Sequence, residues 1–133
     1  MKFLFLLALA ILGQPVHAGE FSLLIYEKPV ELEKQTDPSA SENYWQSYNA
    51  YADVLLKAGV MRGGTALDEN AGETIRDAGV NKISVARLGG YFVIEAANIQ
   101  AAREWASKAP ASAVAIEIRP HRVNPSAAMA PKQ

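Results

Sequence analysis

The segment from 86 to 109 most constrains the fold, because it combines a strand, a tight connection and a helix. Leu88 to Gly90 leads into an apolar strand over 91–95, and Asn98 stands where a helix cap is expected. Apolar residues then recur at helical spacing to the end of the segment. One strand and one helix bury too little apolar surface to offset the entropy lost on ordering. We therefore expect this unit to pack on further strands.

Composition limits the classes of function. The chain has 133 residues, half of them hydrophobic and a fifth charged, which is typical of one globular domain. A formal net charge of -1 gives no basic face for nucleic acid. The absence of cysteine excludes disulfides, thiolate metal sites and a thiol nucleophile.

The first 18 residues have the pattern of a secretory signal peptide. Lys2 is followed by an apolar run over 3–12, and Val16 and Ala18 suit cleavage before Gly19. An uncleaved anchor or a first buried strand are the alternatives, but the apolar run is shorter than the roughly 20 residues that span a bilayer. The sequence therefore predicts a periplasmic or secreted protein with no membrane attachment after cleavage.

The first half of the mature chain reads as strand, loop and helix. An apolar run over 21–26 is short enough for a strand buried on both faces. Charged and turn-forming residues over 28–40 predict a loop. A capping box over 39–42 predicts a helix from Ser41 to about Ala58.

The second half supplies the remaining strands. Residues 60–67 read as a strand bent at Gly63 and Gly64, where a bulge or a close backbone approach is expected. A hairpin is predicted over 73–85 and a closing strand over 114–119. The Pro- and Ala-rich residues 121–133 predict a disordered tail.

This order of elements predicts an α+β domain over 19–120. It matches the ferredoxin-like split β-α-β sandwich, in which an antiparallel sheet carries two helices on one face. The other face would expose an apolar patch. We therefore expect a homodimer that places the two sheet faces together.

Blocks of sequence carry a family resemblance. They are Leu23–Glu27, Tyr48–Leu67, Leu88–Ala96, Ala101–Pro110 and Val114–Pro120. In this order they resemble the YCII-related, or DGPF, domain family. The resemblance implies a ferredoxin-like fold, a dimeric α/β barrel and a cleft between each protomer's helices and sheet. Some relatives of this kind catalyse eliminations or isomerisations on small ring compounds, and the family implies no obligatory cofactor.

The chain departs from the family pattern at the residues that would carry catalysis. The Asp-Gly-Pro-Phe motif is missing, and the family's His-Asp pair is absent. Tyr48 occupies the His position, while Glu27 or Lys28 stands near the Asp position. His17 falls in the signal peptide and His121 at the root of the tail, so no His-based general base or metal site is expected.

Five residues are candidates for binding a ligand. Tyr48 and Tyr26 carry phenols that can donate to a ligand oxygen, although core aromatics are the alternative. Glu27 and Arg62 are expected to face one cleft, the alternative being a surface ion pair. Arg87 is a third charged candidate.

The sequence leaves three functions open. The first is an exported protein that binds a small molecule in a cleft between helices and sheet. The second is a cofactor-independent lyase or isomerase acting on a small cyclic compound, and the third is a non-catalytic structural dimer. For the second, Tyr48 as a general base near neutral pH would need a large depression of its pKa.

Overall fold

The computed structural model describes residues 18–68, 71–73, 75 and 85–122. Its elements are β1 (Gly19–Glu27), α1 (Pro29–Leu32), a 3-10 turn (Glu33–Gln35), α2 (Ser41–Lys57), β2 (Met61–Ala66), β3 (Arg87–Ala96), α3 (Ile99–Ala106) and β4 (Ala113–Pro120). Three predictions fall wholly or mostly outside the described residues. They are the signal peptide predicted over 1–18, the hairpin predicted over 73–85 and the disordered tail predicted over 121–133.

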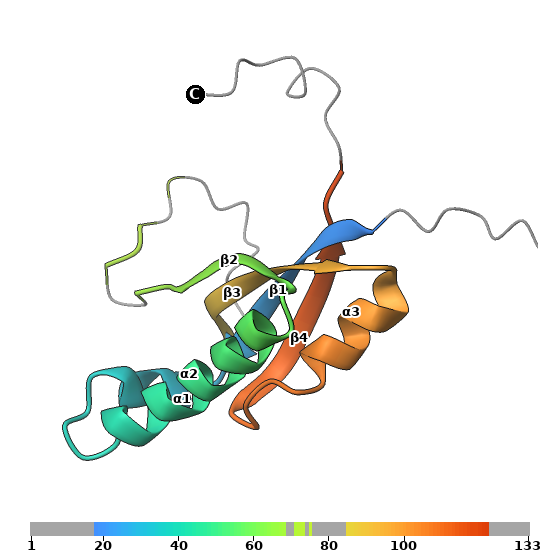
Figure 1. The fold of residues 1–133 in the computed structure, drawn as a ribbon. Helices are drawn as coiled ribbons and strands as arrows, with labels where there is room; N and C mark the ends of the chain where they lie inside the picture. Colours follow the sequence, from blue (N-terminus) through green and yellow to red (C-terminus); the bar gives the residue numbers. More distant parts are fainter. Residues whose placement is uncertain (1–17, 69–70, 74, 76–84, 123–133) are drawn as a thin grey trace, which may run out of the picture.

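The four strands form one antiparallel sheet in the order β2-β3-β1-β4. Figure 1 shows α2 and α3 on the same side of this sheet. Each strand thus lies beside partners that are distant in the sequence, and β1 is central because both β3 and β4 pair with it. The predicted ferredoxin-like α+β fold is confirmed.

The hydrophobic core lies between the sheet and the two longer helices. Its buried residues are Phe21, Leu23, Tyr51, Leu55, Ile94, Ala96, Ala102 and Ala106. Along β1, residues facing the helices are buried and those facing the other way, such as Leu24 and Tyr26, are only half-buried. The prediction that β1 is buried on both faces is therefore wrong for the single chain, because nothing in the described ranges covers the second face.

The segment predicted as a loop over 28–40 contains helical structure. Pro29 stands at the first helical position of α1, where its fixed φ suits the helix and its missing N–H costs nothing. Leu32 is buried and holds this short helix against the rest of the domain. The composition indicated turns but not this apolar anchor.

The start of α2 is correctly placed at Ser41, but the predicted capping box does not form. The N-cap residue is Ala40, which makes no side-chain cap hydrogen bond. Ser39 is engaged elsewhere, since its backbone N–H and its hydroxyl both donate to Asp37 Oδ1 at 2.8 Å. At α3 the predicted cap is confirmed, because Asn98 Oδ1 accepts from the backbone N–H of Ala101 at 2.9 Å.

Glycines in β2 and β3 leave room under α2. The register of β2 shifts between Met61 and Gly63, which confirms the predicted bulge. Gly64 pairs with Phe92, and Gly90 pairs with the buried Ile25, so both glycines take positions on the helix side of the sheet. With no side chain at either position, a space remains between the sheet and the first half of α2.

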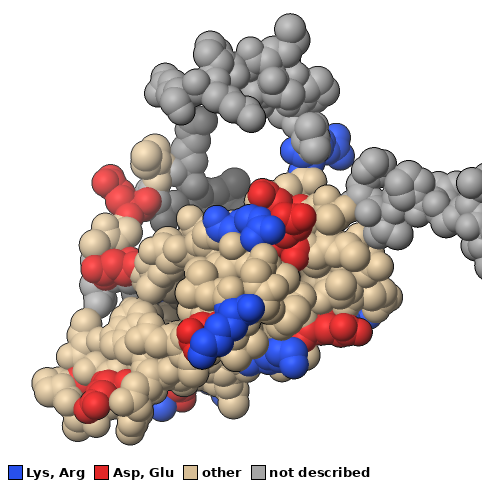
Figure 2. Space-filling view, viewed as in Figure 1, with Lys and Arg blue, Asp and Glu red and all other residues tan. Residues whose placement is uncertain are grey.

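The helix-bearing face shows no dominant charge. In Figure 2, Lys and Arg side chains alternate with Asp and Glu over this face, with uncharged surface between them. Among the described helices, none combines the length and apolar character needed to cross a membrane.

Candidate functional site

A cavity of about 160 Å³ lies between the first half of α2 and the β2–β3 end of the sheet. Aromatic side chains form much of its wall, namely Tyr44, Trp45, Tyr48 and Phe92. Gly64, Gly89 and Gly90 line it from the sheet side. The absent side chains of these glycines and the ring-rich face of α2 together account for its shape.

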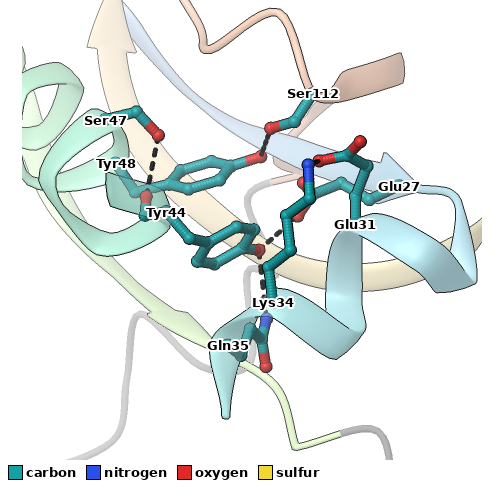
Figure 3. A network of polar contacts seen from close by, with 8 residues as sticks. All are labelled: Glu27, Glu31, Lys34, Gln35, Tyr44, Ser47, Tyr48 and Ser112. Atoms are coloured by element: carbon teal, nitrogen blue, oxygen red, sulfur yellow. Dashed lines mark hydrogen bonds and ion pairs between the residues drawn. The ribbon is translucent and has the colours of Figure 1, made fainter. Parts of the chain in front are cut away.

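Glu27 is the charged residue of the cavity. It ends β1 on the helix side of the sheet, and only 1% of its surface is exposed. Tyr44 donates its hydroxyl proton to Glu27 Oε1 at 2.5 Å, and Gln35 Nε2 donates to the same hydroxyl at 3.1 Å (Figure 3). The Gln35 bond fixes the direction of the Tyr44 hydroxyl, so that one carboxylate oxygen is held by a phenol donor.

The second carboxylate oxygen has no such partner. Glu27 Oε2 is buried, and no residue in the described part of the chain makes a hydrogen bond of normal geometry to it, although the Tyr48 hydroxyl lies close to the carboxylate. Leaving a buried polar atom unpaired costs about 1–3 kcal/mol, and more when the group is charged. Buried unpaired atoms are therefore rare, and they often mark a place where a ligand, ion or water binds.

Tyr48 lies four residues after Tyr44 and lines the same cavity. Its hydroxyl is 3.5 Å from Ser112 Oγ, at the start of the segment that leads into β4 (Figure 3). Burial is the main reason that the pKa of Tyr48 lies far above the ordinary value for a phenol. A hydrogen bond with Ser112 lowers the pKa, whereas the negative charge of Glu27 and a close polar contact with that carboxylate raise it further. This direction is opposite to the depression that a general base requires. Tyr48 is therefore a protonated donor at neutral pH.

Gly89 has a role that sequence reasoning missed. A Cβ at this position would lie 2.6 Å from Leu32 Cδ2 and 3.2 Å from Glu27 Oε1. A side chain there would push against the carboxylate and against the residue that anchors α1. Gly89 thus makes space for Glu27 and Leu32.

Three predicted site residues lie away from the cavity. Arg62 makes an ion pair with Glu95, with Nη2 and Oε2 2.6 Å apart, so the expected meeting of Glu27 and Arg62 in one cleft is wrong. Tyr26 faces the open side of the sheet and donates to Glu117 at 3.3 Å. Arg87 is exposed at the start of β3 and does not line the cavity. Of the five candidates, only Glu27 and Tyr48 share a site.

The partners of Glu27 were not selected from the sequence. Tyr44 precedes Tyr48 by four residues, a spacing that places both phenols on one helix face. That spacing, together with a carboxylate at the end of an apolar strand, is the available signal. Gln35 carries no comparable signal, because its position depends on the 3-10 turn after α1.

A second polar cluster lies near the other end of β1. His121 Nε2 is 2.6 Å from Ser22 Oγ, and His121 Nδ1 is 3.3 Å from Glu20 Oε2. The three side chains are partly exposed, and none of them lines the cavity. The backbone N–H of His121 also donates to Glu20 O at 2.8 Å, so the chain stays attached to β1 at this residue.

Comparison with known proteins gives one clear family match. The model of the YCII-related domain matches residues 20–122, which include every strand and helix of the domain except Gly19, the first residue of β1. No curated protein matches the chain. Within the described ranges, no group of three or more His, Asp or Glu side chains is arranged to hold a metal ion.

Proposed function

The chain belongs to the YCII-related domain family, and from its geometry we propose that it binds a small cyclic compound in the cavity beside Glu27. One observation carries the proposal, namely the buried Glu27 Oε2 that has no hydrogen-bond partner in the described ranges. A ligand with an O–H or N–H group would satisfy this oxygen and remove the cost of leaving it unpaired.

The size and walls of the cavity indicate the kind of ligand. An apolar cavity of about 150 Å³ holds a benzene ring, so a volume of about 160 Å³ suits a compound with one ring. Aromatic walls favour the flat faces of such a ring. The Tyr48 hydroxyl, which stays protonated, supplies a donor for a ligand oxygen.

Benzyl alcohol is a suitable first probe, because it has one ring and one hydroxyl donor. Titration into labelled protein should shift the amide NMR signals of Gly89 and Gly90. In Glu27→Met the affinity should fall about 10- to 100-fold, since a hydrogen bond to a charged group contributes about 1.5–3 kcal/mol. Arg62→Gln, outside the cavity, should bind as the parent does. If ring probes shift no cavity signal, the binding proposal fails.

A lyase or isomerase acting on a small cyclic compound is the second candidate. The observation in its favour is that an unpaired carboxylate oxygen and a protonated phenol line one cavity. The carboxylate would accept a proton from the ring compound, while the Tyr48 hydroxyl would stabilise the oxyanion that develops. Loss of turnover in Glu27→Gln with binding retained would identify this activity.

We also propose that the exported domain forms a homodimer through the open face of its sheet. Half-buried apolar side chains on that face come from the two central strands, with Leu24 on β1 and Tyr91 and Val93 on β3. Covering such a patch with a second copy removes it from water. The first strand begins at Gly19, which is the residue predicted to follow the signal peptide.

Native mass spectrometry of the protein from its own host tests both parts of this proposal. We expect a dimer of chains that begin at Gly19. Val93→Glu should give a monomer, because a dimer would bury an unpaired charge. Val54→Glu on the exposed side of α2 should remain dimeric. A monomeric parent protein would contradict the homodimer. A parent protein that retains Met1 would contradict export.

A further inference from the structure

The cavity beside Glu27 carries charge of one sign. Glu27 is the only charged side chain among the described residues that line it, and no Lys, Arg or His of the described chain contributes to the wall. Lys34 forms an ion pair with Glu31 at 2.8 Å, and neither residue lines this cavity (Figure 3). The negative charge of the carboxylate is therefore not balanced within the cavity.

An unbalanced buried charge selects among ligands. A buried carboxylate is costly unless an opposite charge and hydrogen bonds compensate it. The bond from Tyr44 to Oε1 supplies a hydrogen bond but no charge. A neutral alcohol would add one more hydrogen bond at Oε2 and still leave the charge unpaired, whereas an anion would be repelled.

The aromatic wall favours the same ligand class. The rings of Tyr44 and Trp45 meet edge to face at 5.1 Å, and the rings of Tyr44 and Tyr48 lie 5.2 Å apart. Together with Phe92 they line the space next to the carboxylate. Aromatic faces attract cations, with a contribution of about 2 kcal/mol where water is excluded. The carboxylate and the aromatic rings thus both favour a cationic ligand.

From this combination, and resting on the proposed binding role, we infer that the cavity selects a small organic cation, namely a protonated amine on a single ring. The ammonium group donates to Glu27 Oε2 and faces the aromatic wall, while the ring fills the rest of the volume. The unpaired oxygen gives the ligand its orientation, and the charge gives the selectivity.

Three probes of nearly equal size separate charge from shape, namely benzylamine, benzyl alcohol and benzoate. At neutral pH, calorimetry on the full mature protein should show benzylamine binding at least about tenfold more tightly than benzyl alcohol, as expected for a compensated buried charge. Benzoate should not bind measurably. Amide NMR shifts at Gly89 and Gly90 should place both bound probes in this cavity.

Two substitutions test the origin of the preference. Glu27→Gln removes the charge but keeps the shape, so benzylamine should lose about tenfold or more in affinity, whereas benzyl alcohol should lose less because it keeps a hydrogen bond to the neutral amide. Glu104→Gln removes one charge from the exposed surface of α3 and should leave both affinities unchanged.

The possible outcomes separate this inference from the proposed function. Equal affinity for benzylamine and benzyl alcohol would overturn the cation preference and leave ligand binding in place. Equal loss of benzylamine affinity in Glu27→Gln and Glu104→Gln would also overturn the cation preference, because the overall charge of the protein would then explain the binding. Failure of all three probes would overturn ligand binding together with this inference. The comparison of probes on the parent protein decides the matter even if Glu27→Gln does not fold.

Discussion

Replacing Glu27 by Met together with Tyr44 by Phe should raise the free energy of unfolding by about 1–4 kcal/mol. The double variant removes a buried carboxylate, its unpaired oxygen Oε2 and the phenol that serves Oε1. Methionine has nearly the length of glutamate, and the surroundings of this side chain include the apolar Leu32. Substituting apolar groups of similar volume for buried polar partners is often stabilising.

The single variant Tyr44→Phe should have the opposite effect. It leaves both oxygens of Glu27 without a donor among the described residues, which should lower the free energy of unfolding by about 1–3 kcal/mol. Urea unfolding of the parent, the two single variants and the double variant forms a complete cycle. A double variant less stable than the parent would show that the Glu27–Tyr44 pair contributes net stability.

Such a result would bear directly on function. Because proteins tolerate an unfavourable group where a function needs it, a variant that gains stability and loses binding indicates a binding site. Gain of stability with unchanged binding of the probes would leave the carboxylate without a role in the cavity. The stability cycle and the titrations therefore address the same oxygen by independent means.

The sequence was sufficient to predict the fold, because the signals that define it are local. The apolar runs of the strands, the apolar residues at helical spacing and the Asn98 cap are each defined by residues close together in the sequence. The observed strands and helices form where these signals occur. Where the prediction failed, a competing local contact decided the outcome. Ser39 bonds to Asp37 instead of capping α2, and Pro29 with Leu32 converts the expected loop into α1.

The site was only partly predictable, because it depends on contacts between distant segments. Glu27 and Tyr48 were identified, but the bulge in β2 decides where Arg62 points, and a sequence pattern does not fix the exact position of a bulge. Met61 pairs with Ile94 and Gly63 with Val93, so Arg62 is the extra residue between two paired ones. Its guanidinium then reaches Glu95 instead of the cavity.

The second large effect is expected in the glycine doublet of β2. Gly64→Ala should lower the free energy of unfolding by about 2–3 kcal/mol, from backbone strain and overpacking. A Cβ at Gly64 would lie 2.6 Å from the carbonyl oxygen of Tyr91 and 3.1 Å from Phe92 Cα, and neither backbone atom can move without displacing β3. The φ of Gly64 is +150°, which side chains rarely permit.

Gly63→Ala is the matched control, since it adds the same methyl group one residue earlier. The nearest atom to its Cβ would be Val93 Cβ at 4.0 Å, an ordinary contact, and its φ is not positive. This variant should be as stable as the parent or more stable by about 0.4–1 kcal/mol, because alanine restricts the unfolded chain. Denaturant midpoints at one protein concentration would measure both variants, and equal losses would contradict the strain argument. Since Gly64 also lines the cavity, a side chain at this position should reduce the space open to a ligand as well.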